Sequence, residues 1–280
     1  MSLKRGLTAL VGIPVLVVIV HQGVVAVFLL LLIVCSLAIL EFFNMLDAHF
    51  YKYQKNPGLV FNILLLAAFY LQSQTGIHFP VFVITVSLMV FLLGAVLSGE
   101  LTEMFVYVST TMLAVLYTGG LAGYIILLRG LHSSGESLVY LLLITTWFSD
   151  SFAYWVGTGF GKHKLAKDIS PNKSWEGAAA GLAAAVIGAM LWREVTCSGI
   201  FGALNLNLEV LRPAQCAFIG LLIGVSGQLG DLAESLFKRN AGVKDSGEIL
   251  PGHGGILDRC DGLIFSAPVL YYYIKFIGLS

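Results

Sequence analysis

Apolar stretches long enough to cross a lipid bilayer as helices recur along the whole chain. A helix needs about 20 apolar residues to span the hydrocarbon. Nine stretches reach or approach this length: 7–20, 24–46, 58–72, 77–98, 103–128, 137–157, 175–193, 212–237 and 262–278. Only 11% of the residues are charged, whereas a soluble domain has about 25%. We therefore expect an all-α, polytopic membrane protein with about nine transmembrane helices.

Nothing in the sequence divides the chain into separate domains. It contains no internal repeat and no low-complexity linker, so we expect one integral membrane domain over residues 1–280. The first 130 residues read as generic membrane helices, and 137–280 as the half that carries the chemistry. Lys4 and Arg5 precede the first apolar stretch, but no small-x-small cleavage site follows, so we expect an uncleaved first helix.

The basic residues predict an orientation, because cytoplasmic loops are enriched in Lys and Arg. With nine crossings, the N-terminus and the segments 47–57, 158–174 and 238–261 lie on one side. That side holds twelve of the 16 basic residues: Lys4, Arg5, Lys52, Lys55, Lys162, Lys164, Lys167, Lys173, Lys238, Arg239, Lys244 and Arg259. The other side holds Arg129, Arg193, Arg212 and Lys275. We predict a cytoplasmic N-terminus and an external C-terminus.

The glycines of 103–128 allow that stretch to break into two half-helices, but the charge distribution favours a single crossing. The net charge is zero, which gives no electrostatic basis for binding nucleic acid. The four cysteines are scattered and form no CxxC pair, which argues against a disulfide framework and a zinc site. The two long inner loops, 158–174 and 238–261, are rich in Gly, Lys and Asp, so we expect function at the cytoplasmic face.

Carboxylates interrupt the apolar pattern near the end of the stretch 212–237. Asp231, Glu234, Ser235 and Lys238 follow one another at i, i+3, i+4 and i+7, so they share one helical face. A carboxylate within a membrane helix is costly unless it is paired, ligated or hydrated. The alternative is an interfacial helix end with ordinary solvated charges.

A glycine-rich loop follows this helix. Gly252, Gly254 and Gly255 allow backbone N–H groups to approach a ligand closely, which suits phosphate oxygens. Lys244 and His253 add further donors. The glycines alone would also fit a flexible surface loop.

Two further carboxylates, Asp258 and Asp261, stand just before the last apolar stretch. They are three residues apart and face the same way if a helix has begun. Together with Asp231 they offer oxygen ligands for a hard divalent cation. The alternative is helix capping, since acids are favoured in a first turn.

The stretch 235–261 reads S-L-F-K-R-N-A-G-V-K-D-S-G-E-I-L-P-G-H-G-G-I-L-D-R-C-D. It resembles the signature of the phosphatidate cytidylyltransferase family, the CDP-diacylglycerol synthases, at every fixed position. A second block, S-P-N-K-S-W-E-G at 170–177, is similar to the family's other cytoplasmic block, with Asn172 where Lys is more frequent. The glycines at 157–161 are not a P-loop, because no soluble strand precedes them and His163 follows Lys162.

The resemblance implies a multi-pass enzyme of the cell (inner) membrane whose active site faces the cytoplasm. It would transfer CMP from CTP to phosphatidic acid, and its products would be CDP-diacylglycerol and pyrophosphate. It implies Mg²⁺, with K⁺ beside it, held by Asp231, Asp258 and Asp261. The residues expected to act on the phosphates are Lys173, Lys238, Arg239, Lys244, His253 and Arg259. Those expected to bind substrate are Ser170, Ser174, Ser235, Gly252, Gly254 and Gly255. A homodimer is compatible with the sequence.

Two alternative functions lead to other expectations for the sequence. CDP-alcohol phosphotransferases also place aspartates at a membrane face, but their Asp-Gly…Ala-Arg…Gly…Asp…Asp pattern is missing from this sequence. A secondary transporter would use intramembrane charges such as Glu41 and Asp150, but it would require two related halves with paired broken helices. The sequence shows no such symmetry.

Overall fold

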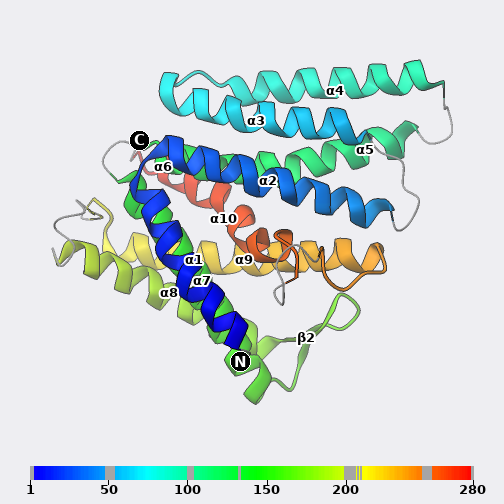
Figure 1. Cartoon of the computed structure of the whole chain (residues 1–280). Coiled ribbons are helices and arrows are strands. Elements are labelled where there is room, and N and C mark those ends of the chain that lie inside the picture. Colours follow the sequence, from blue (N-terminus) through cyan, green and yellow to red (C-terminus); the bar gives the residue numbers. More distant parts are fainter. Residues whose placement is uncertain are drawn as a thin grey trace. The chain divides into compact units, whose positions relative to one another are not determined.

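The structure is a computed structural model, and it describes residues 3–47, 54–99, 104–131, 134–198, 206, 208, 210–247 and 254–278. Helices account for most of the described residues (Figure 1). The α-helices are α1 (Leu3–His21), α2 (Val24–Asp47), α3 (Lys55–Thr75), α4 (Phe79–Ser98), α5 (Met104–Val115), α6 (Leu121–Arg129), α7 (Gly135–Phe160), α8 (Trp175–Cys197), α9 (Pro213–Asn240) and α10 (Leu257–Phe276). A π-helical turn, η1 (Leu116–Gly120), joins α5 to α6.

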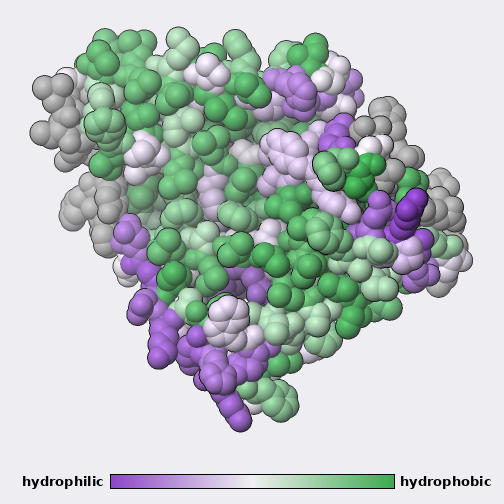
Figure 2. Space-filling model, turned by 180° about the vertical axis from the view of Figure 1, so that it is seen from behind, coloured by the Kyte–Doolittle hydropathy of each residue, from purple (hydrophilic) through white to green (hydrophobic). Residues whose placement is uncertain are grey.

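The helices follow the apolar stretches closely. Because α5, η1 and α6 are continuous, the ten α-helices make nine helical segments in the described part of the chain. Six of them are long and apolar enough to cross a membrane: Val24–Leu46, Lys55–Thr75, Phe79–Leu97, Met104–Arg129, Trp175–Cys197 and Pro213–Asn240. Much of the face drawn in Figure 2 is hydrophobic. These features confirm an all-α, polytopic membrane protein, while the number and direction of the crossings stay predictions.

The stretch 103–128 is one helical segment and not two half-helices. Its irregular part is the π-helical turn, which contains Gly119 and Gly120. Thr118 in that turn donates a hydrogen bond to the buried Asn62 side chain of α3. The turn therefore widens the helix locally without ending it.

The described residues form two compact units, and each unit is built from two separate stretches of the chain. The first unit comprises residues 1–130 and 238–259, and the second comprises 131–237 and 260–280. The helices α9 and α10 therefore each contribute residues to both units. In the first unit, α3 packs against α2, α4 and α6. The expectation of one domain over 1–280 stays a prediction.

In the second unit, α7 packs along α8, and α8 along α9. A side chain at Gly220 would lie 2.7 Å from the backbone of Val186, so α8 and α9 approach closely. The hydroxyls of Ser226 in α9 and Ser266 in α10 lie 3.0 Å apart and link those two helices. Small residues thus allow close helix packing here, as is common in membrane proteins.

A short antiparallel hairpin lies between α7 and α8, within the predicted inner loop. The loop prediction of 158–174 begins too early, since α7 continues to Phe160. The strands are β1 (Lys164–Ala166) and β2 (Ser170–Ser174), and Lys164 is opposite Ser174. The hairpin is an ordered element that the sequence does not predict.

Candidate active site

Three carboxylates converge in the second unit, at the polar end of the apolar helices α9 and α10. One oxygen each from Asp231, Glu234 and Asp261 lies within 4.8 Å of the others. Asp231 and Glu234 are three residues apart on α9, so the helix places them on one face. Glu234 is only 1% exposed, whereas 42% of the Asp231 side chain is exposed. The group therefore combines a buried carboxylate with one that solvent reaches.

The close packing of α9 on α10 brings the third carboxylate to the other two. A side chain at Gly230 would lie 2.7 Å from the carbonyl oxygen of Asp261 and 2.6 Å from Cβ of Phe265. Glycine at this position therefore allows the two helices to approach one another beside Asp231. A larger residue would push Asp261 away from the group.

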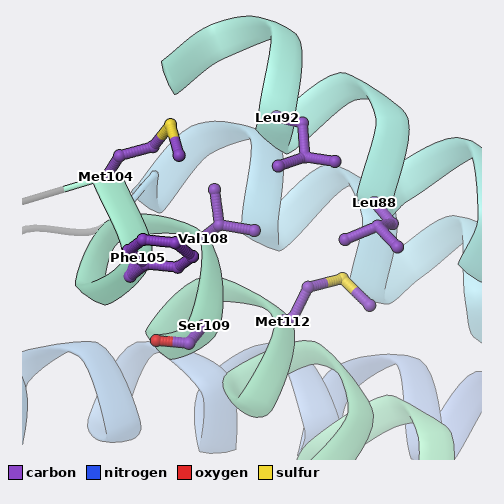
Figure 3. Close-up of a pocket in the computed structure, with 7 residues that line it drawn as sticks. All are labelled: Leu88, Leu92, Met104, Phe105, Val108, Ser109 and Met112. Atoms are coloured by element: carbon purple, nitrogen blue, oxygen red, sulfur yellow. The ribbon is translucent and has the colours of Figure 1, made fainter. Parts of the chain in front are cut away.

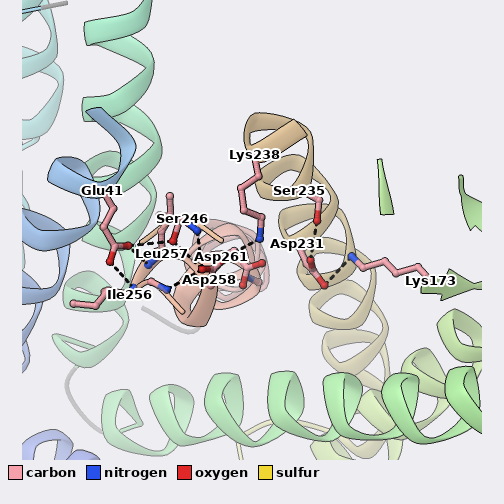
Figure 4. A network of polar contacts seen from close by, with 12 residues as sticks. Glu41, Lys173, Asp231, Ser235, Lys238, Ser246, Ile256, Leu257, Asp258 and Asp261 are labelled. Carbon is pink, nitrogen blue, oxygen red and sulfur yellow. Dashed lines mark hydrogen bonds and ion pairs between the residues drawn. The ribbon is translucent and has the colours of Figure 1, made fainter. Parts of the chain in front are cut away.

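The positively charged ammonium group of Lys173 contacts this acidic group. It lies on β2, and its Nζ is 2.7 Å from Oδ2 of Asp231, with 24% of the Lys173 side chain exposed (Figure 4). The Ser235 hydroxyl donates to the other oxygen of Asp231 over 3.4 Å. Asp231 is thus oriented by one neighbour on its own helix and by one on the hairpin.

The hairpin that presents Lys173 is anchored at its base. Ser174 is the N-cap of α8, and its hydroxyl accepts a hydrogen bond from the N–H of Gly177. Glu176 in the first turn of α8 accepts hydrogen bonds from the backbone N–H groups of Lys162 and His163. Its carboxylate also lies 2.6 Å from the His163 ring nitrogen Nδ1. These contacts fix both ends of the hairpin to α8.

A second polar cluster lies in the first unit, around Asp258. Its Oδ1 is 2.6 Å from Nζ of Lys238, and both side chains are nearly buried, at 10% and 13% exposed (Figure 4). Its Oδ2 accepts hydrogen bonds from the N–H and hydroxyl of Ser246 and from the N–H of Gly255. Both oxygens of Asp258 are therefore engaged by donors from α9 and from the loop before α10.

Glu41 of α2 completes the second cluster. Its carboxylate accepts hydrogen bonds from the N–H groups of Ile256 and Leu257 at 2.9 and 3.0 Å. The Ser246 hydroxyl lies 3.2 Å from Oε2 of Glu41 and 3.0 Å from Asp258. Glu41 is 1% exposed. The Ser246 hydroxyl thus lies between the buried carboxylate of Glu41 and the nearly buried one of Asp258, which are more than 200 residues apart in the sequence.

The structure divides the three predicted metal ligands. Asp231 and Asp261 belong to the acidic group of the second unit, together with Glu234, which the sequence places on the same face but not among the ligands. Asp258 belongs to the cluster of the first unit. Asp258 and Asp261 do both lie at the start of α10, so the condition that a helix has begun is met.

The other predicted residues have varied surroundings. Arg239, Lys244 and Arg259 are exposed. Ser170 lies on β2, opposite Ala166. Gly254 has a positive φ of 82°, which favours glycine. Gly252 and His253 lie outside the described residues.

An apolar hollow between α4 and α5 is not a second candidate for the chemistry (Figure 3). Its lining residues are Leu88, Leu92, Met104, Phe105, Val108, Ser109 and Met112. None of these seven side chains titrates near neutral pH, and no cation or carboxylate lines the hollow. Phe105 is 83% exposed, as expected for a side chain that faces lipid.

Comparison with known proteins then identifies the family. A model of the cytidylyltransferase family matches residues 3–277. The chain belongs to the cytidylyltransferase family. A phosphatidate cytidylyltransferase of Bacillus subtilis is 34% identical over 275 residues, which is 97% of each chain. A protein of the same name from Synechocystis is 33% identical over 269 residues, or 86% of each chain. One from Brucella suis is 42% identical over 158 residues, which covers 56% of this chain and 54% of that protein.

Membership in the cytidylyltransferase family excludes both rivals considered from the sequence and accounts for the acidic group. Three carboxylates whose oxygens lie this close repel one another, and one of them is almost fully buried. Lys173 offsets part of that negative charge. Oxygen donors of this kind suit a hard cation such as Mg²⁺. The residues present therefore fit the divalent metal that the family uses.

The sequence of this member of the cytidylyltransferase family does not show that Glu41 belongs to a polar cluster. The first 130 residues read as generic helices, and Glu41 enters only as a residue of the rival transporter. The available signal is its charge, because Glu41 is the one acidic residue in the apolar stretch 24–46. Such a residue is a candidate for function by default, but nothing in the sequence names its partners.

Proposed function

We propose that this chain transfers CMP from CTP to phosphatidic acid, with CDP-diacylglycerol and pyrophosphate as products. The observation that carries the proposal is the acidic group with Lys173, found in a chain that matches the cytidylyltransferase family from residue 3 to residue 277. The relatives over nearly the whole chain bear the name of this activity. The proposal extends that activity to this chain.

The chemical difficulty of this reaction is charge. The phosphate of phosphatidic acid, already anionic, attacks the α-phosphorus of CTP, so a strong general base has little to contribute. What the site must supply is positive charge and orientation. When bound, Mg²⁺ would supply positive charge that offsets the charge of the phosphates. We propose that Asp231, Glu234 and Asp261 would hold it, and Asp258 stays a proposed ligand.

Lys173 is the side chain best placed to act on a phosphate beside these carboxylates. Asp231 holds its ammonium group, and the hairpin anchored to α8 fixes its backbone. We propose that Lys173 contacts a phosphoryl oxygen and stabilises the charge that develops in the transition state. Lys238, Arg239, Lys244, His253 and Arg259 stay proposed phosphate contacts, and Ser170, Ser174, Ser235, Gly252, Gly254 and Gly255 stay proposed substrate-binding residues.

We also propose that the chain crosses the cell (inner) membrane nine times, with its N-terminus and active site on the cytoplasmic side. Nine helical segments in the described residues and the distribution of basic residues support this topology. So does the contact between Glu41, near the end of α2, and the loop after α9, since the proposal puts both on the same side. A homodimer stays a prediction.

The test is an assay of the purified protein in detergent with phosphatidic acid, CTP and Mg²⁺. We expect CDP-diacylglycerol and pyrophosphate in equal amounts, and none when either substrate is left out. The matched control is Asp231→Asn, which keeps the size of the side chain and removes its charge. Folded wild-type protein that forms no CDP-diacylglycerol at any Mg²⁺ concentration would contradict the proposal.

A further inference from the structure

The first unit contains a buried carboxylate, that of Glu41, which the packing of apolar helices does not explain. Glu41 lies near the end of α2, a helix of otherwise almost entirely apolar residues, and is 1% exposed. A buried carboxylate costs several kcal/mol unless donors surround it. Its oxygens point at the loop before α10 and at the first residues of that helix (Figure 4).

The partners of Glu41 are donors at the start of α10. The N–H groups of Ile256 and Leu257 would otherwise lack partners within the helix, because the first N–H groups of every helix do. Glu41 accepts from both at 2.9 and 3.0 Å. The positive end of the helix dipole also favours a carboxylate at this position. Glu41 therefore caps α10 from another helix.

Two glycines show how closely the loop surrounds this carboxylate. A side chain at Gly247 would lie 2.6 Å from Oε1 of Glu41, and one at Gly255 would lie 2.6 Å from Oε2. These positions therefore have no space for a larger residue while Glu41 is in place. The loop before α10 is shaped around the Glu41 side chain.

The contacts of Glu41 extend, through Ser246, to residues proposed to act in catalysis. Ser246 lies within hydrogen-bonding distance of both Glu41 and Asp258, at 3.2 and 3.0 Å. Asp258 in turn holds Lys238 at 2.6 Å. A shift of the Glu41 carboxylate would therefore move the first turn of α10, and with it Asp258 and the ammonium group of Lys238.

We propose that Glu41 is a positioning residue for the cytidylyltransferase reaction, which sets Asp258 and Lys238 through Ser246 and the start of α10. The inference rests on the proposed function. It gives the N-terminal helices a part in catalysis without contact to either substrate.

The test compares Glu41→Gln with Ser246→Ala in the full-length protein. An amide cannot accept hydrogen bonds at its nitrogen, so Glu41→Gln loses the bonds to one of its two former oxygens. Ser246→Ala removes the hydroxyl that lies between Glu41 and Asp258 and keeps the backbone N–H that donates to Asp258. We expect Glu41→Gln to raise the KM for CTP and the half-activating Mg²⁺ concentration by about 10-fold or more, and Ser246→Ala to raise them by about 3-fold or more.

The matched control is Asn62→Ala. Asn62 is a fully buried polar residue of the same unit, and its side chain donates to the carbonyl of Cys35 in α2. Asn62→Ala should lower thermal stability and the active fraction while the KM for CTP and the Mg²⁺ dependence stay at their wild-type values.

The inference is overturned if Glu41→Gln behaves like Asn62→Ala, with a lower maximal rate and unchanged KM and Mg²⁺ dependence, or like the wild type. If Glu41→Gln does not fold, Ser246→Ala decides, and wild-type kinetics in that variant overturn the inference. Wild-type protein that makes no CDP-diacylglycerol would instead contradict the proposed function, so the two failures are distinguishable.

Discussion

The ion pair between Lys238 and Asp258 allows a quantitative prediction. The two charged atoms are 2.6 Å apart, and the side chains are 13% and 10% exposed. Removing one partner of a buried pair leaves the other charge uncompensated, which typically costs about 3–5 kcal/mol. Asp258 keeps three other donors, from Ser246 and Gly255. We therefore expect the lower end of this range, about 3 kcal/mol, for Lys238→Met.

The measurement is thermal unfolding in detergent. In a chain of this size, 1 kcal/mol shifts the Tm by about 2–4 °C. Lys238→Met should therefore lower the Tm by roughly 6–12 °C. Methionine keeps most of the aliphatic length of lysine, so the loss reports on the charge and not on packing.

A double-mutant cycle with Asp258→Asn identifies the pair as the cause. If the two charges interact, the double variant should be more stable than the sum of the single effects predicts, by about 1.5 kcal/mol or more. A change in Tm of less than about 2 °C for Lys238→Met, or effects that add to within about 0.5 kcal/mol, would refute the reasoning. The pair would then be solvated and energetically weak.

Three further predictions concern the metal, a lysine and the topology. Asp231→Asn and Glu234→Gln should each lower turnover by at least about 100-fold, and near-normal Mg²⁺ titration curves in both would rule out the assigned ligands. Lys173→Ala should lower kcat/KM for both substrates by about 30- to 1000-fold with little change in Tm, and Lys173→Arg should restore only part; wild-type kinetics in Lys173→Ala would return the hairpin to a structural role. In a cysteine-free background, Asp245→Cys should react with an impermeant thiol reagent only from the cytoplasm and Leu204→Cys only from outside, and the reverse pattern would overturn the topology.

Much of the fold follows from the sequence because apolar length is a local property. Each of the nine predicted stretches coincides with a helical segment, since lipid solvent requires that the backbone satisfy its own hydrogen bonds. The hairpin at 164–174 escapes prediction, because its two strands are short and lack alternating apolar residues. Its order comes from contacts with α8, which no local pattern encodes.

Part of the candidate site is also predictable from the sequence, because helical spacing is a local property. The helical spacing of Asp231 and Glu234 is enough by itself to place both on one face. That Glu234 groups with Asp231 and Asp261 depends on how α9 packs against α10 at Gly230. The partners of Glu41 lie 205 to 216 residues away. Contacts at such separations leave no periodicity or motif in a single sequence.

This separation also has a consequence for the order of events during synthesis. A ribosome adds roughly 5–20 residues per second. The chain between Glu41 and its partners at 246–257 then takes roughly 10 to 40 s to appear. During that interval α2 has left the ribosome, and α3 to α9 follow before the partners of Glu41 at 246–257 exist. The contacts between Glu41 and the start of α10 can therefore form only near the end of translation.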